Sequence, residues 1–311
     1  MKVSVIIPTK DRPDGLKRAV TSALAALPKT DATVVVVDDG CQVPATTVLS
    51  GFDTDRLRIV VNDGQHGPSA ARNFGVRQSS ADLIFFLDDD DQLIEGYCQR
   101  TMEILADLPP NCKFGHSASL YDRPGKEYDY HSLKLATGVY GKETPIHLRI
   151  AGLGMGFWIE RSAFDAVGGI DEKLRVNEDT DFSIRLAKMG YSAHYTREPG
   201  VIIYEDPSRS ASDQASITKS AKPLERAKGF EYLLAEHADF LLEHSHFRRK
   251  LLIRSIKYRS RARNSHGWIT TCLRHRPRWE ALVFGLLGTA LLEVSISLRR
   301  VRSLFSRSKQ A

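Results

Sequence analysis

Cysteine is scarce in this chain, with only four among 311 residues. Cys41, Cys98, Cys112 and Cys272 show no paired spacing, so the sequence indicates neither a disulfide framework nor a zinc site. No internal repeat is visible, and the sequence has no P-loop signature of the kind that binds a triphosphate. A signal peptide is not expected, because a strand-like apolar run begins at residue 3. With 42% hydrophobic residues, we expect a cytoplasmic protein with one large core and an appendage.

Three short apolar segments near the start of the chain are followed closely by acidic side chains. The segments are residues 3–8, 33–37 and 81–87, and the polar residues after them include Thr9, Asp11, Asp38, Asp39 and the run from Asp88 to Asp91. Strand-like runs separated by a helical stretch predict a βαβ unit and a parallel sheet. Ligands of such sheets bind beyond the carboxyl ends of the strands, where these acids should converge.

The run from Asp88 to Asp91 is the strongest of these signals. Four adjacent carboxylates repel one another, so a fold that gathers them usually neutralises them with a cation. Hard oxygen ligands favour Mg²⁺ or Mn²⁺, typically shared with a substrate phosphate. The alternative is a solvated acidic turn that caps the next helix.

A glycine-containing loop at residues 62–68 precedes a predicted helix that begins at Ser69 or Ala70. Arg72 would then lie in the first turn, where a cation opposes the helix dipole unless an anion is bound nearby. We therefore interpret Arg72 as a phosphate contact. A surface salt bridge to Asp63 or Asp82 is the alternative.

Six segments, in this order and spacing, resemble the family 2 glycosyltransferases. They are Val-Ser-Val-Ile-Ile-Pro-Thr (3–9), Val-Val-Asp-Asp-Gly (36–40), Ser-Ala-Ala-Arg-Asn-Phe-Gly (69–75), Phe-Leu-Asp-Asp-Asp-Asp (86–91), Gly-Gly-Ile-Asp-Glu (168–172) and Asn-Glu-Asp-Thr-Asp-Phe-Ser-Ile-Arg-Leu (177–186). The resemblance covers about three fifths of the chain, residues 3 to 190. Each segment by itself is weak evidence for the family, whereas the segments together, in this order, are strong evidence.

The resemblance implies a GT-A fold, an α/β nucleotide-diphospho-sugar transferase fold with a mostly parallel central sheet flanked by helices. Residues 1–215 would form this domain, with a nucleotide-binding half at 1–95 and an acceptor half at 96–215. Residues 216–311 would form a helical, basic extension. The implied activity is metal-dependent, inverting sugar transfer from a nucleotide sugar to a hydroxyl of a saccharide or lipid-linked saccharide. Such transfers build cell-envelope polysaccharides or glycolipids.

The resemblance also assigns the metal and the donor nucleotide. Asp88 and Asp90 fit the family's Asp-x-Asp motif, with Asp90 as the direct ligand of Mn²⁺ or Mg²⁺. Asp88 or Asp89 would share the ion or reach the ribose, and the tetrad leaves the register open by one residue. Asp91 would only cap the following helix. The nucleotide positions carried over are Pro8, Thr9, Asp11 and Asp39. An Asp39 carboxylate that accepts the imide N–H of uracil favours UDP, while dTDP and GDP stay open.

Asp179 matches the catalytic aspartate of the family, which would remove the proton of the acceptor hydroxyl. Asp179 would aim into the cleft while Asp181 or Glu178 binds elsewhere, with Glu178 a candidate contact to the acceptor, the sugar or the metal. The competing interpretation is a helix N-terminus that carries acids for its dipole, with Asn177 as the cap. Trp158 follows a glycine-rich segment and would either stack on a sugar or begin a core strand.

Many relatives carry a histidine that completes the metal site, but the matching stretch here has none. Asp206 or Glu205 would replace it, or water would. Arg209 is a candidate clamp for the diphosphate, on a loop at residues 208–222 that would close over it.

Positive charge gathers in the last quarter of the chain, at residues 248–250, 257–263, 274–278 and 299–302. The apolar residues 279–298 are interrupted by Glu280 and Glu293, which favours a helix lying on anionic lipid over one that spans the bilayer. We expect peripheral contact with the inner face of the cell membrane. A solvated bundle packed through residues 230–242 is the alternative. No nucleic-acid partner is expected, because no such motif accompanies the arginines.

Two other classes of function fit parts of the sequence. A Mg²⁺-dependent phosphatase or nucleotidyltransferase would also use strand-end aspartates, but it would need its own nucleophile or triphosphate loop. A non-catalytic carbohydrate-binding or scaffold protein would keep the fold without the activity. The pairing of Asp90 with Asp179 argues against that.

Overall fold

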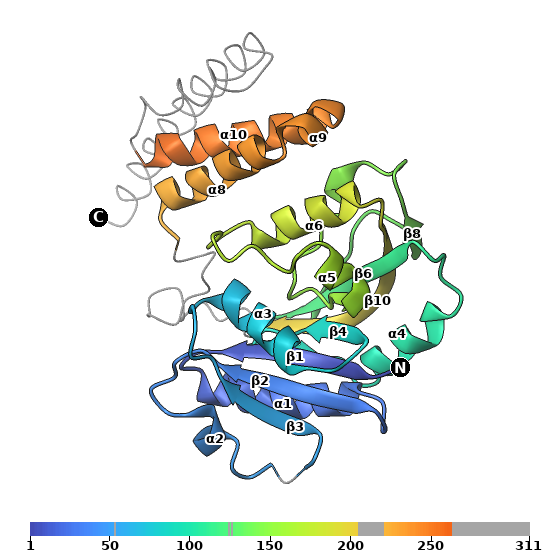
Figure 1. The fold of residues 1–311 in the computed structure, drawn as a ribbon, viewed down its shortest axis with the longest axis vertical. Coiled ribbons are helices and arrows are strands. Elements are labelled where there is room, and N and C mark those ends of the chain that lie inside the picture. The colour runs from blue at the N-terminus through green and yellow to red at the C-terminus, as the bar shows by residue number, and fades with distance from the viewer. Residues whose placement is uncertain (53, 124, 126, 205–220, 263–311) are drawn as a thin grey trace. The chain divides into compact units, whose positions relative to one another are not determined.

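The computed structural model describes residues 1–52, 54–123, 125, 127–204 and 221–262. The chain forms two compact units, which divide between residues 219 and 220 (Figure 1). The candidate residues Asp206, Glu205 and Arg209, and the apolar stretch 279–298, lie outside the described residues.

The first unit is built on a ten-stranded mixed sheet with the order β3-β2-β1-β4-β9-β6-β10-β5, to which β7 adds beside β6 and β8 beside β10. The strands are β1 Val3–Thr9, β2 Ala32–Asp38, β3 Leu57–Val61, β4 Leu83–Phe86, β5 Gln92–Leu93, β6 Cys112–Asp122, β7 Asp129–His131, β8 Gly138–Tyr140, β9 Trp158–Glu160 and β10 Ser192–Tyr204. The helices of this unit are α1 Pro13–Ala26, α2 Ala45–Val48, α3 Pro68–Gln78, α4 Tyr97–Leu105, α5 Arg161–Ala166 and α6 Glu178–Lys188, with a 3₁₀ turn, η1, at Ile146–Leu148.

The half of the sheet from β3 to β4 is parallel, as the βαβ pattern predicts. The other half is mixed, because β9 runs antiparallel to both β4 and β6, while β6 and β10 are parallel. The predicted α/β architecture is confirmed, and its parallel part is confined to the N-terminal strands. That part carries the acidic strand ends to one edge.

The core lies on both faces of the sheet, because successive residues of a strand point to opposite sides. On β1, Val5 and Ile7 join one apolar cluster with the buried side of α1 and α4, while Ile6 joins the other with α3, α5 and α6. Gly75 lets α3 lie directly on the sheet, since a Cβ there would come within 2.5 Å of Ile6. Strands buried on both faces explain the unbroken apolar runs in the sequence.

The second unit, over its described residues, contains helices α8 Pro223–Glu236, α9 Ala238–Glu243 and α10 Ser245–Arg261. Glu231 of α8 accepts two hydrogen bonds from Arg259 of α10, at 2.5 and 2.6 Å, and one from Ser255 at 2.8 Å. The rings of Phe230 and Tyr258 stack between the same helices. Within the described parts of the chain, no helix is both long and apolar enough to cross a bilayer.

Candidate active site

The polar residues that follow β1, β2 and β4 meet at one edge of the sheet. Thr9 pairs with Asp38 across β1 and β2, and the amide of Asp39 donates to the carbonyl of Thr9 at 2.9 Å. Asp38 itself caps the next loop, because its carboxylate accepts the amides of Gly40, Cys41 and Ala45. These donors lower the pKa of Asp38 although its partial burial opposes them.

Asp89 turns back toward the first strand. Its carboxylate accepts the Thr9 hydroxyl at 2.8 Å and the Arg12 guanidinium at 2.7 Å, and it is buried. Burial raises the pKa of Asp89 to about 6, although Arg12 and Thr9 act to lower it. Asp89 therefore ties the aspartate turn to β1, and its side chain does not join the other three acids.

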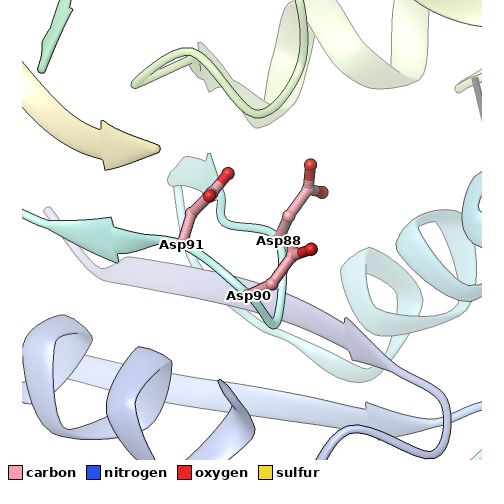
Figure 2. Close-up of side chains that lie close together, drawn as sticks. All are labelled: Asp88, Asp90 and Asp91. Carbon is pink, nitrogen blue, oxygen red and sulfur yellow. The ribbon is translucent and has the colours of Figure 1, made fainter. Parts of the chain in front are cut away.

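The other three acids of the run form a group whose carboxylate oxygens lie within 4.8 Å of one another: Asp88, Asp90 and Asp91. Figure 2 shows Asp88 and Asp91 projecting to the same side of the turn after β4, with the Asp90 side chain below that of Asp88. Oxygens around a six-coordinate Mg²⁺ or Mn²⁺ lie about 3 to 4 Å apart, so these residues fit a hard divalent cation. The turn is not solvated throughout, because Asp91 is buried, while the Asp88 side chain is 37% exposed.

Asp91 differs from its expected role. Helix α4 begins after Gly96, so Asp91 does not cap it. Its carboxylate instead accepts the backbone N–H of Tyr204, at the end of β10, at 3.1 Å. Burial, together with the carboxylates of Asp88 and Asp90, raises the pKa of Asp91 well above its usual range. Side-chain direction within a turn is not encoded by residue spacing, so this contact could not be predicted from the sequence.

Arg72 lies between the aspartate turn and α6. It is 5% exposed and donates a short hydrogen bond to Asp88, rather than pairing with Asp63 or Asp82. Burial lowers the pKa of Arg72, but the carboxylates of Asp88, Glu178 and Asp179 outweigh it, and the pKa is raised. Its Nε and Nη1 are buried without a hydrogen-bond partner among the described residues. Unsatisfied guanidinium donors beside a cluster of acids are suited to a phosphate.

Asp179 and Glu178 open helix α6. Asp179 accepts the amide of Thr180 at 2.6 Å, and burial raises its pKa while that bond acts to lower it. Burial, followed by the charge of Asp179, raises the pKa of Glu178 to about 7. Asn177 has φ of 65° and, among the described residues, makes no side-chain cap. The competing interpretation expected Asn177 to cap this helix, and its side chain does not do so.

A glycine loop, defined here as residues 152–156, brings the two groups of acids together. A Cβ on Gly154 would lie 2.6 Å from the Asp88 carboxylate, and one on Gly152 would lie 3.8 Å from that of Asp179. Only residues without a side chain permit the first approach. Asp88 and Asp179, from distant parts of the chain, are thus held against the same short loop.

Trp158 is a core residue. It is 1% exposed in β9, where β4 and β6 pair on either side, and its ring lies 6.4 Å from that of His194. The prediction that it stacks on a sugar is wrong, and the core-strand alternative describes it. A fully buried indole has no face left for a ligand.

The remaining predicted nucleotide residues lie at the same strand ends. Pro8 is part of β1, and Asp11 accepts the amide of Gln42 at 2.7 Å. Asp39 is buried, and its carboxylate accepts the Asn62 side chain at 2.7 Å and the Gly67 amide at 2.8 Å. It therefore holds the loop that leads to Arg72, and a nucleobase would have to share its oxygens with these donors.

Asn73 links two segments near the site, a contact that the sequence did not reveal. Its side chain donates to the Ile170 carbonyl and to Glu172, both at 2.8 Å, and accepts the Ile170 amide at 2.9 Å. These bonds fasten the 69–75 segment to the 168–172 segment. Both segments belong to the six that resemble the family, and this was the only indication in the sequence that they lie together.

Comparison with known proteins identifies relatives of this arrangement. Residues 4–164 match the family described as "Glycosyl transferase family 2". The chain is 29% identical over 238 residues to the pre-mycofactocin glycosyltransferase of Mycobacterium tuberculosis, covering 71% of this chain and 47% of that protein. It is 32% identical over 138 residues to GalNAc(5)-diNAcBac-PP-undecaprenol beta-1,3-glucosyltransferase of Campylobacter jejuni, covering 41% and 44%. The chain thus spans about half the length of these relatives.

Among solved structures, S. aureus TarS 1–349 in complex with UDP-GlcNAc superimposes with a TM-score of 0.68. Sequence identity is 15%, and the match covers 93% of this chain and 88% of TarS 1–349. At this identity the likeness concerns the fold, a mixed sheet flanked by helices.

Proposed function

The chain belongs to glycosyl transferase family 2, and from this premise we propose that it transfers a sugar from a UDP-sugar to an acceptor hydroxyl with inversion. The fold is the GT-A fold expected from the motifs. The proposed acceptor is a saccharide or lipid-linked saccharide, in cell-envelope polysaccharide or glycolipid synthesis.

One observation carries the proposal: Arg72 is buried between the aspartate turn and Asp179 and keeps two donors unsatisfied. The two open N–H donors call for acceptor oxygens, and the oxygens of a diphosphate suit a guanidinium well. Because the acids around Arg72 already carry negative charge, a bound diphosphate requires a cation beside them. A nucleotide sugar with a divalent metal meets both requirements.

In the proposed reaction, Asp179 accepts the proton of the acceptor hydroxyl as that oxygen attacks the anomeric carbon. Its position against the glycine loop supports this assignment, since Asp88 contacts the same loop. Asp88 and Asp90 would hold the metal, which supplies positive charge to the leaving diphosphate. Arg72 would bind the same phosphates, while Asp89 keeps the turn fixed on β1. A single displacement inverts the anomeric configuration, so no covalent nucleophile is needed.

The UDP preference rests on two supports. A carboxylate such as Asp39 can accept the imide N–H of uracil, which cytosine lacks. The structural neighbour TarS 1–349 was solved with UDP-GlcNAc. Pro8, Thr9 and Asp11 would line the same nucleotide subsite at the end of β1.

We also propose that residues 216–311 form a separate, basic extension that contacts anionic membrane from the cytoplasmic side. Helix α10 supports this, because its residues 245–261 include seven arginines and lysines and no acidic residue. The C. jejuni relative is named for a lipid-linked (undecaprenol) saccharide. Liposome flotation tests this part separately: recovery only in the soluble fraction with anionic vesicles would contradict it.

The catalytic proposal is tested by measuring UDP release from a panel of UDP-, GDP- and dTDP-sugars with Mn²⁺, for the wild type and for Asp179→Asn. We expect turnover with a UDP-sugar in the wild type and a loss of about 10²- to 10⁴-fold in the variant, the usual contribution of a general base. Mn²⁺-dependent UDP binding should persist in Asp179→Asn. If the wild type showed neither turnover nor metal-dependent UDP binding, the proposal would be wrong. Binding without turnover would indicate the non-catalytic alternative.

A further inference from the structure

We infer that Asp91 is the third protein ligand of the metal. It would serve as the ligand that is a histidine in many relatives and for which Glu205 and Asp206 were the candidates from the sequence. The inference rests on the proposed function and goes beyond it, because the Asp-x-Asp pattern assigns only Asp88 and Asp90. Three features of the described residues carry it: the charge balance of the aspartate run, the anchoring of Asp91, and an unsatisfied cation next to the cluster.

The charge balance separates Asp91 from its neighbours. Arg72 pairs with Asp88, and Arg12 contacts both Asp89, at 2.7 Å, and Asp90, at 3.1 Å. Asp91 is 6% exposed, and in the described parts of the chain its carboxylate contacts no arginine or lysine. A buried carboxylate without a countercharge is costly, and here the neighbouring charges are those of other acids. A cation between the three acids removes that cost.

Asp91 is also held in place from outside the turn. Its Oδ1 accepts the Tyr204 amide, and the Tyr204 hydroxyl donates to Gln92 at 2.6 Å. The guanidinium of Arg18 lies over the Tyr204 ring, 4.1 Å from its centre. Figure 2 shows the Asp91 carboxylate projecting to the same side as that of Asp88. An oriented ligand pays less entropy on metal binding, which is the usual purpose of such supporting contacts.

A second observation, the open donors of Arg72 rather than the acids themselves, supports a ligand at this place. Arg72 is 5% exposed, touches Asp88 and leaves Nε and Nη1 without a partner among the described residues. These donors suit the oxygens of a phosphate, and a phosphate so close to the three acids is stabilised by a cation that lies between it and the carboxylates. A diphosphate-bound divalent ion satisfies both groups at once.

Three carboxylates give an all-oxygen set of protein ligands. Oxygen ligands suit hard ions such as Mg²⁺ and Mn²⁺, whereas a histidine nitrogen would favour softer ions. The site should therefore bind Mg²⁺ in competition with Mn²⁺ and gain little from Zn²⁺.

The test is direct titration of Mn²⁺, followed by the loss of its free electron-paramagnetic-resonance signal, with and without UDP. Asp91→Asn keeps the shape of the side chain and an oxygen for the Tyr204 amide, and removes the charge. We expect its Kd for Mn²⁺ to rise at least about tenfold, as for Asp90→Asn, because each removes one charged ligand. Asp63→Asn, an exposed acid outside the cluster, is the matched control and should bind Mn²⁺ like the wild type.

If Asp91→Asn folded normally and bound Mn²⁺ like the wild type, the inference would be wrong while the proposed function stood. If the wild type bound neither Mn²⁺ nor UDP, the inference about Asp91 and the proposed function would both be wrong. Should Asp91→Asn not fold, a crystal structure of the wild type with Mn²⁺ and UDP decides. We expect an Asp91 oxygen at about 2.2 Å from the anomalous peak, and a peak bound by Asp88 and Asp90 alone would overturn the assignment.

Discussion

Replacing Gly154 with alanine would place a methyl group against the carboxylate of Asp88. The new Cβ would lie 2.6 Å from Asp88 Oδ2, whereas ordinary van der Waals contact begins at 3.4 Å, so the oxygen must retreat by about 0.8 Å. The φ angle of Gly154 is not in the left-handed region, so alanine introduces no backbone strain. The substitution therefore acts on the position of one candidate metal ligand.

The expected effect on catalysis is large and the effect on stability is small. A misplacement of about 1 Å in a reacting constellation costs about 10²-fold in rate, so kcat/KM should fall by about that factor, or about 3 kcal/mol in transition-state free energy. The displaced carboxylate is the mobile end of a side chain that is 37% exposed. The free energy of unfolding should therefore change by less than about 1 kcal/mol.

The assay measures UDP release, Mn²⁺ affinity and urea unfolding for Gly154→Ala and for Gly152→Ala. In the control, the nearest atom is Met155 Cγ at 3.2 Å, which belongs to a flexible side chain, and Asp179 Oδ2 is 3.8 Å away. Gly152→Ala should keep activity within about threefold. Equal activity in both variants would refute the reasoning, as would a Gly154→Ala defect that is explained entirely by unfolding.

Three further outcomes follow from the structure. Arg72→Lys should raise the Kd for UDP at least about tenfold, because the single ammonium nitrogen of a lysine cannot reproduce the planar fork of donors that Arg72 leaves open; calorimetry that gave an unchanged Kd would contradict the phosphate role. Burial lowers the pKa of His116 to about 4 from its ordinary 6.5, so its contribution to stability is fully present above pH 6.5 and is lost as the pH falls toward 4. When the pH falls from 7.5 to 5, the free energy of unfolding should therefore decrease by about 2 kcal/mol less in His116→Phe than in the wild type. Parallel curves of unfolding free energy against pH would contradict the lowered pKa of His116. Trp158→Ala should lower the free energy of unfolding in urea by about 3 to 5 kcal/mol, since it leaves a cavity in the core. A decrease below about 1 kcal/mol would contradict the assignment of Trp158 to the core.

The strand ends could be predicted from the sequence because their signals are local. Apolar runs that stop at Thr9, Asp38 and Asp88 specify strands, and the order of strands and helices specifies a parallel sheet that brings those ends together. The candidate base Asp179 was equally visible, within a helix that begins one residue earlier. The strand and sheet predictions needed only the periodicity of neighbouring residues and the rules of chain crossover, whereas the role of Asp179 came from the family resemblance.

The division of roles inside the aspartate run could not be predicted, because it depends on distant partners. Asp89 is turned inward by Thr9, 80 residues away, and Asp91 is held by Tyr204, 113 residues away. Trp158 was ambiguous for a similar reason, since a strand of three residues has no periodicity to read. Its burial follows from the two strands that pair on either side of it.

The insertion of β9 between β4 and β6 has a consequence for how the chain is made. The edge of β4 stays unpaired on that side until residues 158–160 have been synthesised, 74 residues after β4 ends. At 5 to 20 residues per second, a ribosome needs about 4 to 15 seconds to supply them. During that interval the nascent nucleotide-binding half presents an open, apolar strand edge, the kind of surface that chaperones cover and that aggregates form on. Truncated versions that end before residue 160 should therefore be insoluble.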